Sequence, residues 1–246
     1  MDDFKYLSDY YDRFVGADYK KIADYIDQKL KTTGCHGKYG VDLGCGSGTL
    51  TLLLSELGYD MIGIDRSEAM LSRAFDKKPE NSTVLFSQQD LTDFELFGPA
   101  DFMVSTLDCI NYFKSLDQVN DFFTHCAVHL KDNGILIFDM NTLHKYEQIL
   151  GDNTFIYETD EAFCVWENEF VNPKMYFDLT YFIQNDSGSY DRAEDHQEQT
   201  YFSVNEVTGL LSENGFSVIE IEDDYECCPQ GEQTQRIVIT AQKRSN

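Results

Sequence analysis

A glycine-rich turn, VDLGCGSGT, is the first stretch of the sequence whose residue types point to chemistry. Its glycines, Gly44, Gly46 and Gly48, are spaced as GxGxG. A phosphate-binding loop needs GxxxxGK followed by Ser or Thr, and no lysine follows these glycines. A dinucleotide fingerprint needs a third glycine three residues after the second, which is the position of Thr49. The turn therefore matches neither of these phosphate-binding patterns.

Two aspartates frame the turn. Asp42 precedes the first glycine at the carboxyl end of an expected strand, and Asp65 ends the next expected strand, MIGID. A carboxylate that points into the turn would repel a bound pyrophosphate and attract a ligand with positive charge. S-adenosylmethionine is such a ligand, because it carries a sulfonium and an ammonium group. Asp65 is placed to bind the ribose hydroxyls of a nucleoside. A generic strand–turn–helix unit with a helix-capping aspartate is the less favoured interpretation.

The elements that position these residues alternate between strands and helices from Lys38 to Gly134. Apolar strands are expected at YGVDL, MIGID, TVLFS, ADFMVST and ILIFDMN. Helices are expected at Thr49–Leu57 and Ser67–Phe75, and a third begins at a capping-box pattern of Ser115 and Gln118 and ends at Asn133–Gly134. This alternation predicts an α/β fold with a parallel sheet covered on both faces.

The pattern changes between residues 155 and 202. Aromatic, alternating runs predict antiparallel strands at FIYETD, FCVWENEF, MYFDLTYFI and EQTYF. A capped helix from Ser203 to Asn214–Gly215 follows, and then two strands, FSVIEIEDD and RIVITAQ. The prediction is one α/β domain formed by residues 1–142 and 203–246, with residues 143–202 inserted as an antiparallel β lid.

Four stretches resemble the motifs of the class I S-adenosylmethionine-dependent methyltransferases. VDLGCGSG resembles the first motif, GIDRSEAML the second, QQDLTDF the third and DFMVSTLDCINYF the fourth. The N-terminal YYDRFVGADY is similar to that of free-standing bacterial small-molecule methyltransferases, including amino-sugar N-methyltransferases. The resemblance implies a Rossmann-like, doubly wound sheet of seven strands, of which only the last is antiparallel.

The resemblance also implies S-adenosylmethionine as the cofactor, bound at the carboxyl ends of the strands. In the third motif Asp90 would meet the adenine amino group, and Leu91 would pack near the ring. The full set of expected cofactor-binding residues is Tyr11, Asp42, Gly44, Gly46, Asp65, Arg66, Asp90, Leu91 and Leu107.

Three residues after the fourth strand are candidates for contacting the methyl acceptor: Asp108, Asn111 and Tyr112. In the resembled family, the residues at this position face the methyl group of the cofactor. A loop that only caps the sheet edge is the alternative. His196 lies near the end of the insertion, where a lid would return to the sheet, and a solvated strand-edge histidine is an equal alternative. We predict Asp108, Tyr112 and His196 as catalytic residues, with a general base needed only if the acceptor arrives protonated.

No metal site is predicted. His125 and His129 have i, i+4 spacing on a helix, but Cys126 stands where an HExxH motif needs glutamate. A catechol-type metal site would use Asp108 with an Asp–Asn pair after the fifth strand, and in FDMN the intervening Met140 breaks that pair.

The composition of the chain disfavours nucleic acids and membranes as binding partners. The net charge of −25 opposes RNA, DNA and anionic membranes, and no window approaches the ~18 apolar residues of a membrane span. Seven cysteines without a CxxC pair predict a reduced, cytoplasmic protein. We expect a small-molecule methyl acceptor and a monomer or homodimer. The alternatives are an RNA or protein methyltransferase, a cofactor-binding protein without catalysis, and a nicotinamide dehydrogenase.

Overall fold

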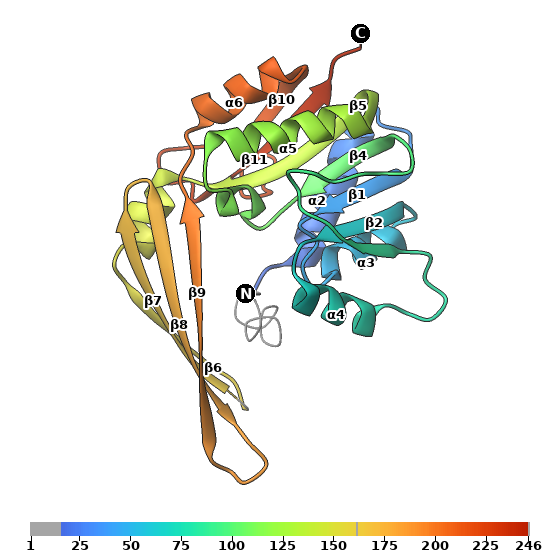
Figure 1. The fold of residues 1–246 in the computed structure, drawn as a ribbon. Helices are drawn as coiled ribbons and strands as arrows, with labels where there is room; N and C mark the ends of the chain where they lie inside the picture. The colour runs from blue at the N-terminus through green and yellow to red at the C-terminus, as the bar shows by residue number, and fades with distance from the viewer. Residues whose placement is uncertain (1–15, 161, 246) are drawn as a thin grey trace.

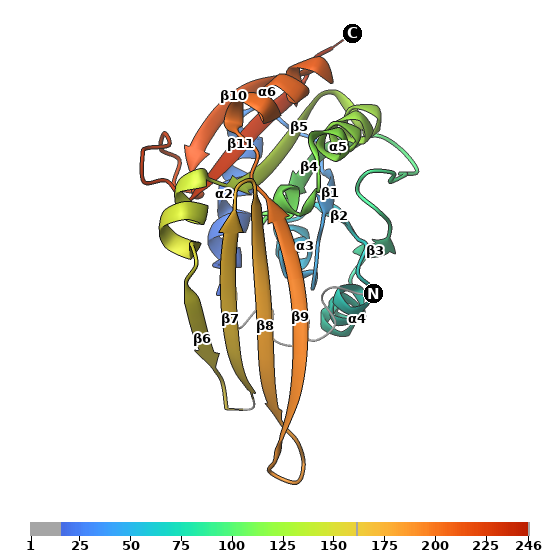
Figure 2. The ribbon, with the colours of Figure 1, turned by 60° about the vertical axis from the view of Figure 1, so that its left-hand side comes forward.

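The computed structural model describes residues 16–160 and 162–245, which form two sheets (Figures 1 and 2). The larger sheet has the strand order β10-β11-β5-β4-β1-β2-β3. Its strands are β1 (Tyr39–Leu43), β2 (Asp60–Asp65), β3 (Leu85–Gln88), β4 (Ala100–Ser105), β5 (Leu130–Asn141), β10 (Phe216–Asp223) and β11 (Arg236–Lys243). Neighbouring strands are parallel except at β11, which is antiparallel to both β5 and β10. The Rossmann-like, doubly wound sheet expected from the sequence is therefore confirmed.

Helices cover both faces of this sheet. The helices α2 (Tyr19–Thr32) and α3 (Thr49–Glu56) share one apolar cluster with the sheet, to which Ile26 and Leu54 belong. The helices α5 (Leu116–His129) and α6 (Val204–Glu213) share a second cluster, to which Phe122 and Leu211 belong. A short 3₁₀ helix, η1 (Cys109–Tyr112), follows β4, and α4 (Glu68–Lys77) packs beside β3. Burying each large apolar side chain in these layers contributes roughly 1.5–3 kcal/mol.

The third predicted helix ends earlier than the sequence indicated. The helix α5 ends at His129, and β5 already begins at Leu130, which pairs with Ala100 of β4. The pairing then shifts, so that Phe102 lies opposite Ile135, and Asn133 has φ of 61°. Asn133 and Gly134 therefore form an irregularity inside a strand and not a helix end, because pairing with β4 outweighs the local cap signal.

The two capping boxes differ. At α6 the box is complete, because the Ser203 side chain accepts from the Glu206 N–H and the Glu206 side chain accepts from the Ser203 N–H. At α5 the Ser115 hydroxyl accepts the Gln118 N–H at 3.4 Å. The Gln118 side chain reaches one residue further back, to the N–H of Lys114 at 2.8 Å, so the predicted reciprocal bond is not made there.

The smaller sheet lies between β5 and α6 in the sequence and projects from the carboxyl-end edge of the larger sheet (Figure 2). Its antiparallel strands are β6 (Thr154–Glu158), β7 (Ala162–Val171), β8 (Lys174–Gln184) and β9 (Tyr190–Thr200), and a π-helical turn, η2 (Lys145–Leu150), precedes them. The strand β9 begins eight residues before the expected EQTYF, since it pairs with β8 over its whole length despite its polar sequence. We call this four-stranded sheet the lid.

The sheet order places a binding site at one edge. The strand β1 lies between β2 and β4, so the chain crosses to opposite sides of β1, and open α/β sheets bind ligands beyond the carboxyl ends of strands at such a point. Among the described residues, the helices are all too short or too polar to cross a membrane.

Candidate active site

The glycine turn joins β1 to α3, and its glycines differ in how closely they are packed. Gly44 and Gly46 have φ of 79° and 51°, a left-handed conformation that costs other residues roughly 1–2 kcal/mol. A Cβ atom on Gly44 would lie 2.3 Å from the Cys109 Sγ atom, whereas a Cβ atom on Gly46 would meet nothing within 4 Å. Gly44 therefore allows close packing against η1, and Gly46 leaves room beside the turn for a ligand.

Asp65 ties this turn to the end of β2. One of its carboxylate oxygens accepts the Gly46 N–H at 2.8 Å, and the other accepts the Ser67 N–H at 2.9 Å. Burial raises the pKa of Asp65, and these two N–H donors oppose the rise. Each carboxylate oxygen has a second lone pair, so Asp65 can still accept hydrogen bonds from ribose hydroxyls.

Asp42 lies deeper, under the turn. Its side chain is buried and accepts the Thr51 hydroxyl at 2.6 Å. Burial raises the pKa of Asp42 to about 7, and the Thr51 bond lowers it only in part. A cationic ligand near this carboxyl group would favour its charged form, whereas a pyrophosphate would not.

Asp90 and Leu91 follow β3, the strand next to β2 in the sheet. Burial would raise the pKa of Asp90, but hydrogen bonds from the Thr92 hydroxyl and N–H outweigh that effect and lower it. Leu91 is buried. Asp90 is thus a charged acceptor beside an apolar surface, which suits an adenine amino group and ring.

One pocket brings the expected cofactor residues together. Its empty space, including the open mouth, is about 1050 Å³. All eight expected residues that the structure describes line it: Asp42, Gly44, Gly46, Asp65, Arg66, Asp90, Leu91 and Leu107. The ninth, Tyr11, lies outside the described residues. The pocket thus offers carboxylates for hydroxyl, amino and cationic groups, which fits S-adenosylmethionine.

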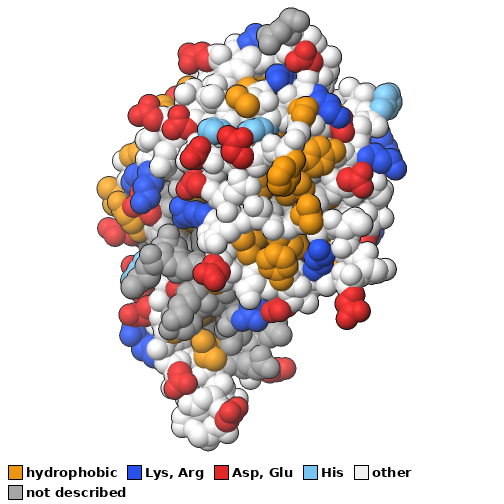
Figure 3. Space-filling model, turned by 45° about the vertical axis from the view of Figure 1, so that its right-hand side comes forward, with side chains coloured by type: hydrophobic (Ala, Val, Ile, Leu, Met, Phe, Trp, Pro, Cys, Tyr) orange, Lys and Arg blue, Asp and Glu red, His pale blue; other side chains and the backbone are white. Residues whose placement is uncertain are grey.

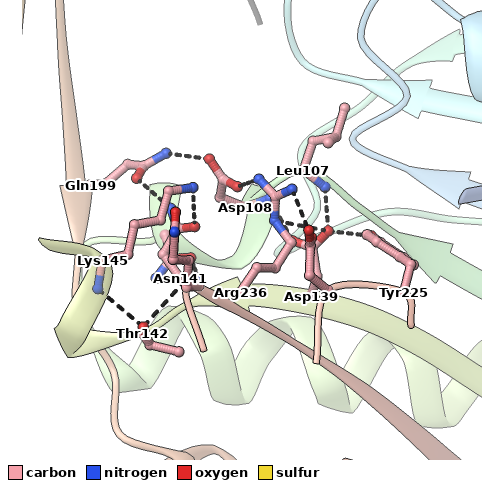
Figure 4. A network of polar contacts seen from close by, with 12 residues as sticks. Leu107, Asp108, Asp139, Asn141, Thr142, Lys145, Gln199, Tyr225 and Arg236 are labelled. Carbon is pink, nitrogen blue, oxygen red and sulfur yellow. Dashed lines mark hydrogen bonds and ion pairs between the residues drawn. The ribbon is translucent and has the colours of Figure 1, made fainter. Parts of the chain in front are cut away.

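The corner after β4 belongs to a network of polar contacts that includes Asp108, Asp139 and Arg236 (Figure 4). Leu107 and Asp108 both have positive φ, 59° and 62°. The buried Asp139 of β5 accepts the N–H of Leu107 at 2.7 Å and the N–H of Asp108 at 2.6 Å. Leu107 lines the pocket, and the Asp108 side chain points into a polar network on the other side.

Asp108 is held as a carboxylate. The Arg236 guanidinium lies 2.5 Å from one oxygen, and the Gln199 amide donates to the other at 3.2 Å. Burial would raise the pKa of Asp108, but the positive charges of Lys145 and Arg236 outweigh it and hold the pKa well below its usual range. A carboxylate with so low a pKa is a weak base.

Tyr112 and Asn111 join the lid to this edge. Tyr112 lines the pocket and donates to the Gln197 side chain at 2.8 Å, and burial raises its pKa. The Asn111 amide donates to the Thr200 carbonyl at 2.9 Å and accepts the Asn141 N–H at 2.9 Å. Tyr112 therefore lies between cofactor pocket and lid as a neutral phenol.

The structure does not bring His196 to the site. Successive side chains of a strand point to opposite faces. Gln197 and Gln199 point inward from β9, so His196 points outward, where its side chain is 72% exposed and pairs with Asp178 of β8 at 2.5 Å. His196, which the sequence predicts as catalytic, is therefore not among the residues that the structure brings together at the pocket.

Replacing His196 by alanine should therefore leave catalysis almost unchanged. We expect methylation rates within about twofold of the wild type, as for a surface substitution away from special features. Rates measured across pH, with Asp178→Asn as a control for the lost ion pair, check this. A loss of about 10²–10⁴-fold that shrinks at higher pH would identify a general base instead.

Sequence reasoning missed Arg236, the first residue of β11, and the inward Gln197 and Gln199. The signal for Arg236 was topological. Because β11 is antiparallel, its first residue lies at the same edge as the carboxyl ends of β4 and β5. Among residues 16–160 and 162–245, no three His, Cys, Asp or Glu side chains are grouped as metal ligands.

Known proteins resemble this chain over most of its length. A family model for a methyltransferase domain matches residues 11–221. Over 239 residues the chain is 30% identical to a protein of Geobacillus sp. (strain WCH70) that is provisionally named a methyltransferase, covering 95% of this chain and 97% of the relative.

Solved structures show the same likeness. The crystal structure of an S-adenosylmethionine-dependent methyltransferase from Clostridium acetobutylicum ATCC 824 is 28% identical, with a TM-score of 0.87 over 97% of this chain and 98% of that one. The sugar N-methyltransferase KedS8 from Streptoalloteichus sp ATCC 53650 shares the fold at 19% identity, with a TM-score of 0.80 over 96% and 92% of the chains. The chain belongs to the S-adenosylmethionine-dependent methyltransferases.

Proposed function

We propose that this methyltransferase acts on a nitrogen or oxygen atom of a small molecule held between the cofactor pocket and the lid. The supporting observation is that β9 is bonded to the acceptor-side edge at three points. Tyr112 meets Gln197, Asp108 meets Gln199, and Asn111 meets the Thr200 carbonyl. Because these hydrogen bonds hold β9 close to the carboxyl ends of the strands, the space left for the acceptor is limited.

The residues at this edge favour alignment over acid–base catalysis. S-adenosylmethionine supplies an activated methyl group with a neutral leaving group. The low pKa of Asp108 and the raised pKa of Tyr112 make neither a ready proton acceptor near neutral pH. Holding two reactants in attack geometry can supply ~7–11 kcal/mol of a barrier. We therefore assign Asp108 and Tyr112 to shaping and orienting the acceptor side.

The inner face of the lid suggests the acceptor's chemistry. Asp195, Gln197 and Gln199 are buried polar residues that follow one another along the inner face of β9. Gln197 and Gln199 bond to Tyr112 and Asp108, so this polar row is part of the proposed acceptor-side edge and suits an acceptor with hydroxyl or amino groups. KedS8, which shares the fold, is a sugar N-methyltransferase, and we propose an amino sugar or a similar hydroxylated amine as the acceptor class.

The charge distribution disfavours the alternative of an RNA substrate. On the face of the described residues that Figure 3 shows, acidic and basic side chains are interspersed, and Lys and Arg form no continuous patch. Binding RNA needs clustered basic residues to neutralise phosphates. The net charge of −25 adds a repulsive field.

Transfer of label from methyl-labelled S-adenosylmethionine tests this proposal. The panel contains nucleotide-linked amino sugars, simple amines, phenols, total RNA and a protein extract. We expect transfer to a hydroxylated amine and none to RNA or protein. Transfer to RNA that weakens with salt, or cofactor binding without transfer to any class, would overturn the small-molecule assignment.

A further inference from the structure

The corner formed by Leu107 and Asp108 has an unusual backbone. Two consecutive residues other than glycine adopt the left-handed conformation, with φ of 59° and 62°. This region is uncommon for such residues and persists only where surrounding contacts impose it. Strained backbone of this kind is concentrated at functional sites.

The contacts that impose it come from one side chain. Asp139 uses one oxygen for the Leu107 N–H at 2.7 Å and the other for the Asp108 N–H at 2.6 Å. The Tyr225 hydroxyl donates to the first of these oxygens, and the Arg236 Nε atom lies 3.8 Å from it. Asp139 is fully buried and Tyr225 is 5% exposed, so these bonds are shielded from water.

The corner is also a wall of the cofactor pocket. Thr106, Leu107, Cys109 and Tyr112 all line that pocket and flank Asp108 on both sides in the chain. Cys109 in turn lies against Gly44, where an added Cβ atom would be 2.3 Å from its sulfur. A shift of the corner would therefore change both the pocket wall and the glycine turn opposite.

We propose that Asp139 is a positioning residue for cofactor binding, whose carboxylate holds the Leu107–Asp108 corner against the glycine turn. Figure 4 shows this arrangement, with the carboxylate between Leu107, Tyr225 and Arg236. The role needs two acceptor oxygens at once. An asparagine offers one oxygen and one NH₂ group, so one backbone N–H would face another donor. The proposal does not depend on the identity of the methyl acceptor.

A matched pair of variants tests it, Asp139→Asn and Asp101→Asn. Asp101 also accepts a backbone N–H, that of Tyr39 at 3.0 Å, and pairs with a cation, Lys131 at 2.6 Å, but at the opposite end of β4. Calorimetric titration with S-adenosylhomocysteine should show a Kd about tenfold higher for Asp139→Asn. Asp101→Asn should stay within about twofold of the wild type.

Hydrogen exchange gives a readout that involves no catalysis. The amides of residues 107 and 108 should exchange much faster in Asp139→Asn and at the wild-type rate in Asp101→Asn. If both variants bind S-adenosylhomocysteine as the wild type does, or if these two amides stay protected in Asp139→Asn, the proposal is wrong. Thermal unfolding of both variants separates a positioning effect from a general loss of folding.

A third variant, Tyr225→Phe, keeps both hydrogen bonds from the backbone N–H groups of Leu107 and Asp108 to Asp139 but removes the donor hydroxyl of Tyr225.

The effect of this variant should depend on pH. The charged groups and thiols facing Asp139 are Arg236 of β11, Asp108 and Cys109 after β4, and Lys145 of η2. Burial already raises the pKa of Asp139, and losing the Tyr225 hydroxyl raises it further. Protonation removes one acceptor, so as pH falls the Kd should begin to rise at a higher pH in Tyr225→Phe than in the wild type. An identical pH dependence would contradict the proposal.

Discussion

Replacing Arg236 by methionine should lower the free energy of unfolding by about 3–5 kcal/mol, the usual cost of removing one partner of a buried ion pair. Arg236 lies 2.5 Å from Asp108 and 3.8 Å from Asp139, and its side chain is 18% exposed. Without it, Lys145 is the remaining cation, among the described residues, that acts on the partly buried Asp108 and the fully buried Asp139. Urea unfolding monitored by circular dichroism measures the change.

The control for Arg236 is Arg192→Met. Arg192 pairs with Glu194 on the exposed surface of the lid, where its side chain is 56% exposed. Surface pairs contribute about 0–1 kcal/mol, so this variant should unfold almost as the wild type does. If both variants lost the same free energy of unfolding, the ion pairs of Arg236 would contribute no more to stability than an exposed surface pair.

The free energy of unfolding that Arg236→Met loses should become smaller as pH falls. In the wild type the folded pKa of Asp108 is depressed, so its charge stabilises the fold above the unfolded pKa, and this contribution is lost as pH falls through the folded pKa. In Arg236→Met the buried carboxyls should have raised pKa values and protonate more readily. The difference in stability between variant and wild type should therefore shrink as pH falls below neutral.

Replacing Asp65 by alanine should weaken binding of S-adenosylhomocysteine by roughly 1–3 kcal/mol, the cost of losing hydrogen bonds to a charged group. The substitution removes an acceptor for the ribose and also the bonds from the N–H groups of Gly46 and Ser67 that shape the turn. Calorimetric titration measures the change, which corresponds to a Kd about 5- to 150-fold higher.

Asp60→Ala is the matched control for Asp65. Asp60 begins the same strand, β2, at the opposite edge of the sheet, and it is exposed. Its removal should change the Kd by less than about twofold. NAD should bind far more weakly than S-adenosylhomocysteine to the wild type. Tighter binding of NAD, or equal effects of the two alanine variants, would contradict the assigned pocket.

The cofactor side of the site could be predicted because its determinants are local. The spacing of Gly44 and Gly46, and Asp65 at the end of the next strand, need only a strand–turn–helix–strand unit to come together. The strand and helix periods predicted that unit, and the structure places these residues in one pocket. Asn133–Gly134 shows the limit of local signals, because pairing of β5 with β4 overrode an ordinary helix-end pattern.

The polar network around Asp108 could not be predicted because it depends on register and on contacts distant in sequence. Asp108 meets Arg236, which lies 128 residues later, and Asp139 meets Tyr225, which lies 86 residues later. In β9 the polar run YDRAEDHQEQ has no alternation of apolar and polar residues to show which side chains point inward. A shift of one residue exchanges the two faces of a strand. The pairing of β9 with β8 therefore decides that the Gln197 side chain points inward and the His196 side chain outward.

The sequence by itself thus determined the class of fold, the family and the residues that line the pocket at the glycine turn, since each of these follows from motifs and periods within short segments. Only the tertiary structure decided that Asp139, Tyr225 and Arg236 support the Leu107–Asp108 corner and that His196 faces solvent. The physical reason is that a buried carboxylate must find its partners wherever the packed chain supplies them, and sequence distance does not limit that choice.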